Sequence, residues 1–213
     1  MEIAKTEDDV TLTTKELSIE NKEDLKPSQN KLHLRLYGHP LCPYVERAKI
    51  ALDSKGIKYQ NVHVSLPDRP KWIYNYHTGA VPILEFQDGK FLAESLLIME
   101  LVDDLYHSEY FHPSDLSKLD HIPHRLYPKD PLKRAEYKMF LENFKDLGLY
   151  FFRATLTKKN DKRQKDLDSI NLLLDILENA LKDSATNFLF DEKAYGFVDV
   201  ALVVQVERLF FMK

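Results

Sequence analysis

The stretch LHLRLYGHPLCPYVERAKIALDSKG, residues 32–56, decides the fold of the first half of this chain. Apolar and polar residues alternate at its start, which is typical of a β-strand, through Leu32, Leu34 and Leu36. Gly-His-Pro at 38–40 interrupts the alternation, and Pro43 then stands where the first turn of a helix tolerates proline. Apolar residues follow at helical spacing as far as Gly56, a residue type that commonly ends helices. The stretch therefore predicts a strand, a turn and a helix.

Further elements are predicted before residue 107. Residues 59–64 have the composition of a second strand, and residues 71–77 suit a short helix or an irregular segment. Residues 82–92 contain two short apolar runs around Asp-Gly, a tight-turn sequence, so they predict a β-hairpin. An amphipathic helix is expected to begin at Glu94-Ser95. The order is β-α-β followed by β-β-α, which makes residues 31–106 an α/β domain.

Residues 107–131 are rich in proline, histidine and aspartate, and we interpret them as a linker between two domains. Residues 132–213 have helical apolar spacing throughout, so the second domain is predicted to be all-α. Residues 167–181 indicate one of its helices, and another is expected from about Val198 onward. A single helix is indicated by Phe140, Phe144, Leu147 and Phe151.

Residues 1–30 form an acidic extension that differs from the rest of the chain. They contain 8 acidic and 4 basic residues, no aromatic residue and little periodicity. This is the composition of a segment that is disordered by itself. The whole formal net charge of −4 therefore lies in this extension.

Composition limits the classes of function. A slightly acidic chain gives no reason to expect nucleic acid as a partner, and no apolar run approaches the ~20 residues that cross a membrane. The acidic N-terminus has no apolar leader, so neither a secretory nor a mitochondrial targeting sequence is expected. The single cysteine, Cys42, cannot form an intrachain disulfide, which fits a reducing compartment. We therefore expect a cytoplasmic protein, with an organellar assembly as the alternative.

Cys42 is the strongest candidate for a chemical role. It follows a predicted strand and precedes a predicted helix, where unpaired N–H groups and the helix dipole favour a thiolate over a thiol. The alternative is a buried structural cysteine, the commoner fate of an isolated one. Thioredoxin-like dithiol enzymes have a second cysteine three positions on, which resolves mixed disulfides, but Val45 stands there. A catalytic Cys42 would need an external thiol, and glutathione is the obvious candidate.

Two residue pairs suit the binding of a peptide-like ligand. Val81-Pro82 opens a predicted strand with a residue that cannot donate to the sheet. Glu94-Ser95 begins a predicted helix, where such a pair is ordinarily a cap. The same place suits a ligand carboxylate, through N–H groups, the Ser95 hydroxyl and the helix dipole, and Glu94 could pair with an ammonium group. Glutathione carries both groups on its γ-glutamyl end.

Together these motifs resemble the glutathione transferase superfamily, and specifically its omega class. The resemblance rests on CPYVER at 42–47, KGI at 55–57, RPKW at 69–72, GAVPILE at 79–85 and ES at 94–95, and it continues through LYPKDP at 126–131. It implies a thioredoxin-like domain followed by an all-helical domain. Omega-class enzymes use an active-site cysteine, form mixed disulfides with glutathione, and act as thiol transferases and dehydroascorbate reductases. Glutathione as co-substrate, a small electrophile or disulfide as second substrate, and no metal are implied with it.

The resemblance also implies roles for single residues between positions 42 and 69. Cys42 would be the nucleophile, and Tyr44 would line the glutathione site. Leu66 and Arg69 match positions near the glycyl end of glutathione, where the family usually has a lysine. Arg69 keeps that positive charge.

The remaining site residues follow from the same resemblance. Val81 would hydrogen-bond the backbone of the cysteinyl residue of glutathione, with Pro82 in the cis form. Glu94 and Ser95 would bind the γ-glutamyl group. The predicted site therefore contains Cys42, Tyr44, Leu66, Arg69, Val81, Pro82, Glu94 and Ser95.

The second half departs from the family pattern. The linker after Tyr106 carries an insertion, and Gly196 stands where the family prefers a serine or threonine cap. The family continues for several helices beyond the position of Lys213, so the helical domain is expected to be C-terminally incomplete. An apolar surface over residues 198–213 would then contact a homodimer partner or a larger protein assembly.

Three interpretations remain open. The first is an active glutathione-dependent thiol transferase or dehydroascorbate reductase. The second is a glutathione-transferase-like structural subunit of a larger assembly, with or without retained glutathione binding. The third is a protein similar to the chloride intracellular channels, which share the cysteine-proline site but lack the Glu94-Ser95 pattern.

Overall fold

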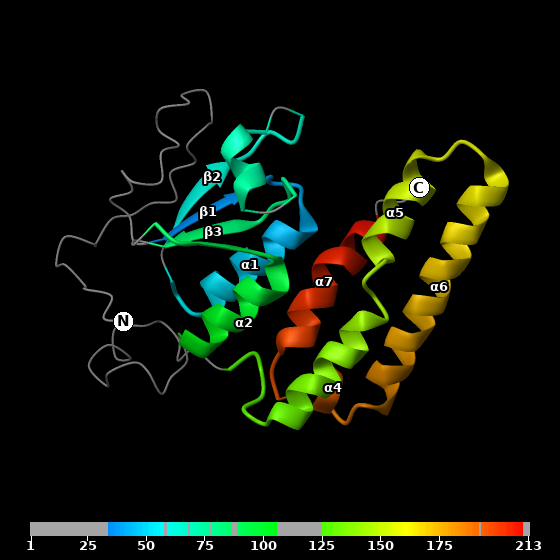
Figure 1. Ribbon diagram of the computed structural model, residues 1–213. Helices are drawn as coiled ribbons and strands as arrows, with labels where there is room; N and C mark the ends of the chain where they lie inside the picture. Colours follow the sequence, from blue (N-terminus) through cyan, green and yellow to red (C-terminus); the bar gives the residue numbers. More distant parts are fainter. Residues whose placement is uncertain are drawn as a thin grey trace. The chain divides into compact units, whose positions relative to one another are not determined.

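The computed structural model describes residues 34–105 and 125–210, apart from six single positions within these ranges, 58, 68, 77, 87, 88 and 192. The chain divides into two compact units, residues 1–124 and 125–213, and each is described by itself (Figure 1). This division falls inside the segment interpreted as a linker. The predictions made for residues 1–30 and for most of 107–131 lie outside the described residues.

The first unit is built on a four-stranded mixed sheet with the strand order β2-β1-β3-β4. Strand β1 (Leu34–Gly38) pairs in parallel with β2 (Gln60–His63) and antiparallel with β3 (Ile83–Phe86). Strand β4 (Phe91–Ala93) completes the predicted hairpin with β3. The β-α-β and β-β-α order expected from the sequence is confirmed, and with it the thioredoxin-like fold.

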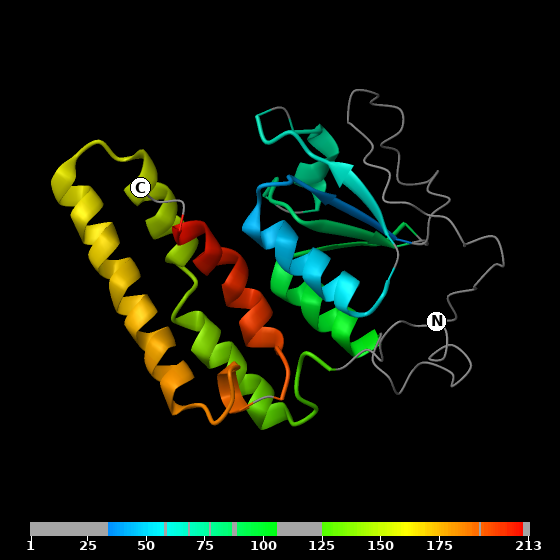
Figure 2. The same ribbon diagram turned by 180° about the vertical axis from the view of Figure 1, so that it is seen from behind.

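Helices α1 (Pro43–Ser54) and α2 (Ser95–Leu105) lie side by side against one face of this sheet (Figures 1 and 2). Alternate strand residues and one face of each helix are buried here because strand side chains alternate sides and helix side chains repeat every three to four residues. The core of this layer contains Leu34, Leu36, Leu84, Val45, Ala48, Leu52, Ile98, Met99 and Val102. Their burial holds α1 and α2 against the sheet.

The strand residues that point the other way form a buried polar network. Arg35 Nε donates to Gln60 Oε1 at 2.9 Å, and Tyr37 Oη donates to Glu85 Oε2 at 2.7 Å. Burial raises the pKa of Tyr37 and of Glu85 because it disfavours their charged forms. The Trp72 ring meets Tyr37 edge-on, with centroids 4.9 Å apart. This contact places the short 3-10 helix η3 (Lys71–Asn75) on this side of the sheet.

A buried ion pair joins α1 to α2. Lys55 follows the last residue of α1, and its Nζ lies 2.7 Å from Oδ1 of Asp103. Both side chains are fully buried. Since a charge without a partner is very costly in the interior, each group depends on the other for its place in the fold.

The second unit is helical. Its elements are α4 (Pro131–Glu142), α5 (Leu147–Leu156), α6 (Asn160–Asp183), the short η4 (Leu189–Asp191) and α7 (Phe197–Leu209). The all-α prediction is confirmed for the described residues. None of the helices in the described parts of the chain is long and apolar enough to cross a membrane.

One prediction for this unit is wrong. The apolar residues from Phe140 to Phe151 were expected on one helix, but α4 ends at Glu142 and α5 begins at Leu147. Between them, Phe144 N–H donates to the Leu141 carbonyl at 2.9 Å, an i to i−3 bond in place of the α-helical i to i−4 bond. Because such turns nearly keep the helical spacing of side chains, the apolar pattern runs on across the break.

Two departures from the family pattern were predicted at α7: glycine at the cap position before the helix, and an exposed apolar surface along and after it. Gly196 precedes the helix, and its N–H donates to Asp199 Oδ2 at 2.8 Å. The Leu189 N–H donates to the other oxygen of Asp199 at 3.1 Å, so Asp199 supplies one half of a capping box and also holds the preceding segment at the helix start, while Gly196 has no side chain for the other half. Phe210, just after the helix, is 81% exposed, and Val203 is exposed as well. The other apolar residues of α7 are buried or half-buried, so the apolar surface expected over residues 198–213 is found at only two of its described positions.

Candidate functional site

Cys42 lies at the N-terminus of α1, as the sequence predicts. Its backbone is extended, and its carbonyl accepts the N–H groups of Val45 at 3.1 Å and Glu46 at 3.2 Å. Its own N–H donates to the His39 carbonyl at 3.0 Å, which closes the turn after β1. The thiol is half-buried, and Sγ lies 4.0 Å from the carbonyl oxygen of Val81. The fold therefore brings the cysteine to the loop that precedes β3.

Gly38 is required for this placement. A Cβ atom at this position would lie 2.4 Å from Cγ1 of Val45 and 2.6 Å from Cγ2. Val45 is itself almost completely buried, so it has little room to move away. Only glycine at the end of β1 lets the first turn of α1 approach closely enough to set the position of Cys42.

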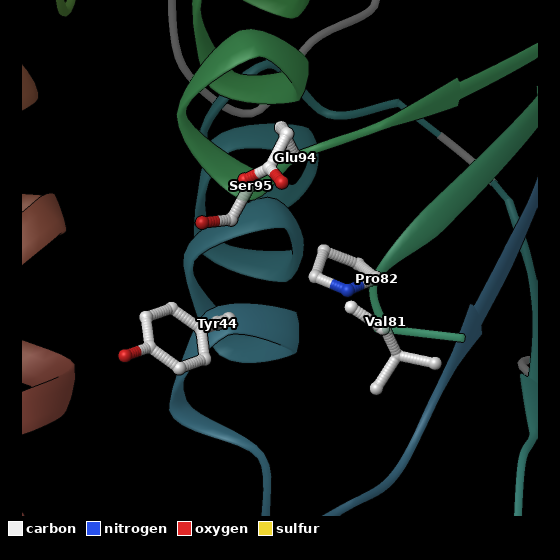
Figure 3. A pocket seen from close by; sticks show the side chains of 6 residues that line it. Tyr44, Val81, Pro82, Glu94 and Ser95 are labelled. Carbon is white, nitrogen blue, oxygen red and sulfur yellow. The ribbon is translucent and has the colours of Figure 1, made fainter. Parts of the chain in front are cut away.

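A pocket opens beside this helix start. It has a volume of about 160 Å³ and is lined by Tyr44, Ala80, Val81, Pro82, Glu94 and Ser95 (Figure 3). Five of the predicted binding residues thus come together from three separate parts of the first unit. The Val81-Pro82 peptide bond is cis, in agreement with the expectation from the resemblance.

Three predicted site residues do not line this pocket: Cys42, which contacts it only through the Val81 carbonyl, and the two residues assigned to the glycyl end of glutathione. Leu66 and Arg69 lie in the segment between β2 and η3, and both are half-buried. Arg69 Nε is buried and has no hydrogen-bond partner among the described residues. Their assignment to the glycyl end of glutathione stays a prediction.

Arg47 is a residue of this site that the sequence interpretation missed. It is buried in α1 and contacts two residues that line the pocket. Its Nη1 donates to Ser95 Oγ at 3.4 Å, and its Cζ lies 5.0 Å from the centroid of the Tyr44 ring. The sequence signal was present, since Arg47 lies one helical turn beyond Tyr44, but nothing in the sequence identifies Ser95 as its partner.

Glu94 has a strained backbone at the edge of the pocket. Its φ is +73°, in the left-handed region that favours glycine, and its carbonyl accepts the N–H of Ile98 at 2.9 Å in the first turn of α2. Such conformations cost on the order of 1–3 kcal/mol and are often found at functional sites. The strained backbone and the position in the pocket lining together make Glu94 a candidate functional residue.

The strain can be measured by comparing Glu94→Gly with Glu94→Ala. Both variants lose the carboxylate, but only glycine relieves the left-handed backbone, so the glycine variant is expected to be more stable by about 1 kcal/mol. In an ordinary position the same exchange from alanine to glycine lowers stability. Urea unfolding measures the difference, and a less stable glycine variant would contradict the assignment of strain.

Within the described residues, no group of three or more His, Cys, Asp or Glu side chains could hold a metal ion. The described site combines a half-buried thiol at a helix start with a pocket lined by hydroxyl, carboxylate and backbone groups.

Comparison with known proteins identifies the family. Residues 36–109 match the family described as "Glutathione S-transferase, N-terminal domain". The chain is 34% identical over 185 residues to a pyrimidodiazepine synthase of Drosophila melanogaster, covering 84% of this chain and 66% of that protein. It is 33% identical over 112 residues to glutathione S-transferase omega-2 of Mus musculus, covering 52% of this chain and 39% of that protein.

A solved structure of the same superfamily has a similar fold. Glutathione transferase Omega 3C from Trametes versicolor superimposes with a TM-score of 0.66 and 27% identity, over 90% of this chain and 75% of that one. The chain spans between 39% and 66% of the length of the two curated relatives. The fold, the first-domain match and these relatives together place the chain in the glutathione transferase superfamily, in which it is similar to the omega class.

Proposed function

We propose that this chain is a glutathione-dependent thiol transferase and dehydroascorbate reductase that works through a mixed disulfide at Cys42. The observation that carries the proposal is the position of the single cysteine, at the start of α1 with its sulfur 4.0 Å from the Val81 carbonyl of the pocket. Proteins of this superfamily use glutathione as co-substrate. Cys42 carries the only thiol group in the sequence.

The reaction is an exchange in two steps. The Cys42 thiolate attacks the glutathione sulfur of a protein–glutathione or small-molecule mixed disulfide, and the substrate leaves as its thiol. A second glutathione then attacks the sulfur of the glutathione bound to Cys42, giving glutathione disulfide and free Cys42. With Val45 in place of a second cysteine, the resolving thiol has to come from solution.

In dehydroascorbate reduction, two glutathione molecules supply the two electrons and two protons. They leave as glutathione disulfide, and ascorbate is formed. The Cys42 thiolate adds to a carbonyl of dehydroascorbate, and one glutathione then attacks the Cys42 sulfur, which expels ascorbate and leaves the Cys42–glutathione disulfide. The second glutathione resolves this disulfide, so both activities depend on the same sulfur.

The pocket residues suggest how glutathione would be held. Ser95 Oγ and the first N–H groups of α2 suit the α-carboxylate of the γ-glutamyl group, and the Glu94 carboxylate suits its ammonium group. Val81 offers its backbone next to Cys42, where the cysteinyl residue would lie. The second substrate, a small electrophile or disulfide, would approach the thiol from the open side.

Mass spectrometry of the intact protein tests the proposal. Incubation with glutathione disulfide is expected to add one glutathionyl group to Cys42, and excess glutathione is expected to remove it. The same preparation should be retained on immobilised glutathione and should turn over a glutathione mixed disulfide. If the protein forms no glutathione adduct at Cys42 and shows no turnover, the proposed function is wrong.

A structural subunit of a larger assembly is the second candidate function, and the exposed Phe210 favours it. Retention on immobilised glutathione without turnover would support this alternative. The pyrimidodiazepine synthase among the relatives indicates that family membership by itself does not determine the acceptor substrate.

A further inference from the structure

His39 accepts the hydrogen bonds of the turn that joins β1 to α1. Pro40 has no N–H group, so the turn contains only two backbone donors before the helix, those of Leu41 and Cys42. The Cys42 N–H donates to the His39 carbonyl at 3.0 Å, and the Leu41 N–H donates to His39 Nδ1 at 3.2 Å. Both N–H groups of the turn that carries the thiol therefore donate to this one residue.

The bond to the His39 ring requires an unprotonated nitrogen. A neutral imidazole has one nitrogen that accepts a hydrogen bond, whereas a charged imidazole carries a proton on both nitrogens and accepts none. Protonation of His39 would therefore set two N–H groups against each other, at Nδ1 and at Leu41. Because an ordinary histidine has a pKa of about 6.5, this conversion lies in the physiological range.

A second histidine lies against the ring of His39. His63 ends β2 in register with Gly38 on β1, and the two imidazole centroids are 5.4 Å apart in an edge-to-face arrangement. Burial lowers the pKa of His39, and a positive charge on His63 lowers it further because like charges repel. His63 is the titratable group that acts on His39 from the neighbouring strand, and Cys42 is the titratable group of its own turn. The surroundings of His39 therefore favour its neutral form at neutral pH.

We propose that His39 is a positioning residue of the thiol site, whose neutral ring closes the turn that carries Cys42 and whose protonation opens it. The two hydrogen bonds fix both peptide groups between Pro40 and Cys42, and with them the place of the sulfur 4.0 Å from the Val81 carbonyl. The response of the turn to pH is independent of any enzymatic activity. Its effect on thiol exchange rests on the function proposed above.

The alternative is a histidine that holds the turn only through its backbone carbonyl, with a ring that has no influence on it. Asparagine distinguishes the two roles, because its side-chain oxygen accepts the N–H group two residues further on and does not titrate. His39→Asn is therefore expected to keep the turn closed at every pH. His39→Ala removes the side-chain acceptor and is expected to weaken the turn at every pH.

The experiment is a nuclear magnetic resonance titration of the isotope-labelled protein between about pH 5 and pH 8, which requires no glutathione. The amide proton of Leu41 is expected to titrate together with the ring protons of His39, with a midpoint below the ordinary value of 6.5. Hydrogen exchange at Leu41, corrected for the intrinsic effect of pH, should be about tenfold faster below the midpoint, the factor for one lost hydrogen bond.

Two variants serve as controls for this titration. In His39→Asn the Leu41 amide should not titrate, because the acceptor carries no proton at any of these pH values. His63→Asn should move the midpoints of His39 and Leu41 upward together, since it removes the like charge and uncovers the ring. If the chain has thiol transferase activity, the kcat of wild type relative to His39→Asn should fall below the same midpoint, and this ratio cancels the titration of the thiol.

A Leu41 amide that does not follow the titration of His39 in wild type would overturn the inference, as would one that titrates equally in His39→Asn. If His39→Asn does not fold, His63→Asn makes the same test, because the midpoints of Leu41 and His39 must then move together. A Leu41 amide that follows His39 in a protein without turnover would support the role of His39 and reject the proposed function. Turnover in a protein whose Leu41 amide does not respond to pH would do the reverse.

Discussion

Cys42→Ser is expected to abolish glutathione-dependent reduction of mixed disulfides and of dehydroascorbate. Both reactions pass through a disulfide on this sulfur, and the chain contains no other cysteine that could replace it. A serine hydroxyl cannot form that bond, so the loss should reach the background rate of the assay. Turnover with a glutathione mixed disulfide, followed through the formation of glutathione disulfide, measures it.

Binding of glutathione should survive the same substitution. The pocket is lined by Tyr44, Val81, Glu94 and Ser95, and only Val81 contacts the sulfur, through a long 4.0 Å contact that a serine hydroxyl can replace. Retention of Cys42→Ser on immobilised glutathione therefore serves as the control for folding. Cys42→Ala serves as a second variant without a hydroxyl nucleophile. Reduction at the wild-type rate in either variant would show that Cys42 is not the nucleophile.

Lys55→Met is expected to lower the free energy of unfolding of the first unit by about 3–5 kcal/mol. The substitution leaves the Asp103 carboxylate fully buried without the ammonium group that lies 2.7 Å away. Because whole domains are stable by only about 5–15 kcal/mol, a large part of the stability of this unit depends on one pair. Urea unfolding, followed by far-UV circular dichroism, measures the shift in midpoint.

The double variant Lys55→Met/Asp103→Leu separates the charge from the packing. When both charges are replaced by apolar side chains, no unpaired charge remains, and most of the lost stability should return. A double variant as unstable as Lys55→Met would show that the loss comes from packing. An unchanged midpoint in the single variant would show that the carboxylate is readily accommodated without Lys55.

The sequence by itself determined most of the first unit. The alternation around Leu34 and Leu36, the Gly-His-Pro turn and the proline at the helix start are local signals, and the structure has β1 and α1 at these positions. The tight-turn sequence between β3 and β4 likewise sets their pairing locally. The position of Cys42 at a helix start follows from these neighbours alone.

Local patterns were insufficient where the backbone changes its hydrogen bonding without changing side-chain spacing. The turn between α4 and α5 keeps a near-helical repeat, so the apolar positions around Phe144 predict one helix although the structure has two. The pattern shows which side chains are buried, and it does not show which carbonyl each N–H contacts.

Only the tertiary structure decided which distant residues meet at the site. Arg47 contacts Ser95 across 48 positions, and the Cys42 sulfur meets the Val81 carbonyl across 39. These contacts exist because β3 pairs with β1 in the centre of the sheet, which brings the loop before β3 and the start of α2 next to the start of α1. Strand order and register depend on how the whole sheet and its two helices bury their apolar faces together. A single local stretch of sequence therefore cannot predict them.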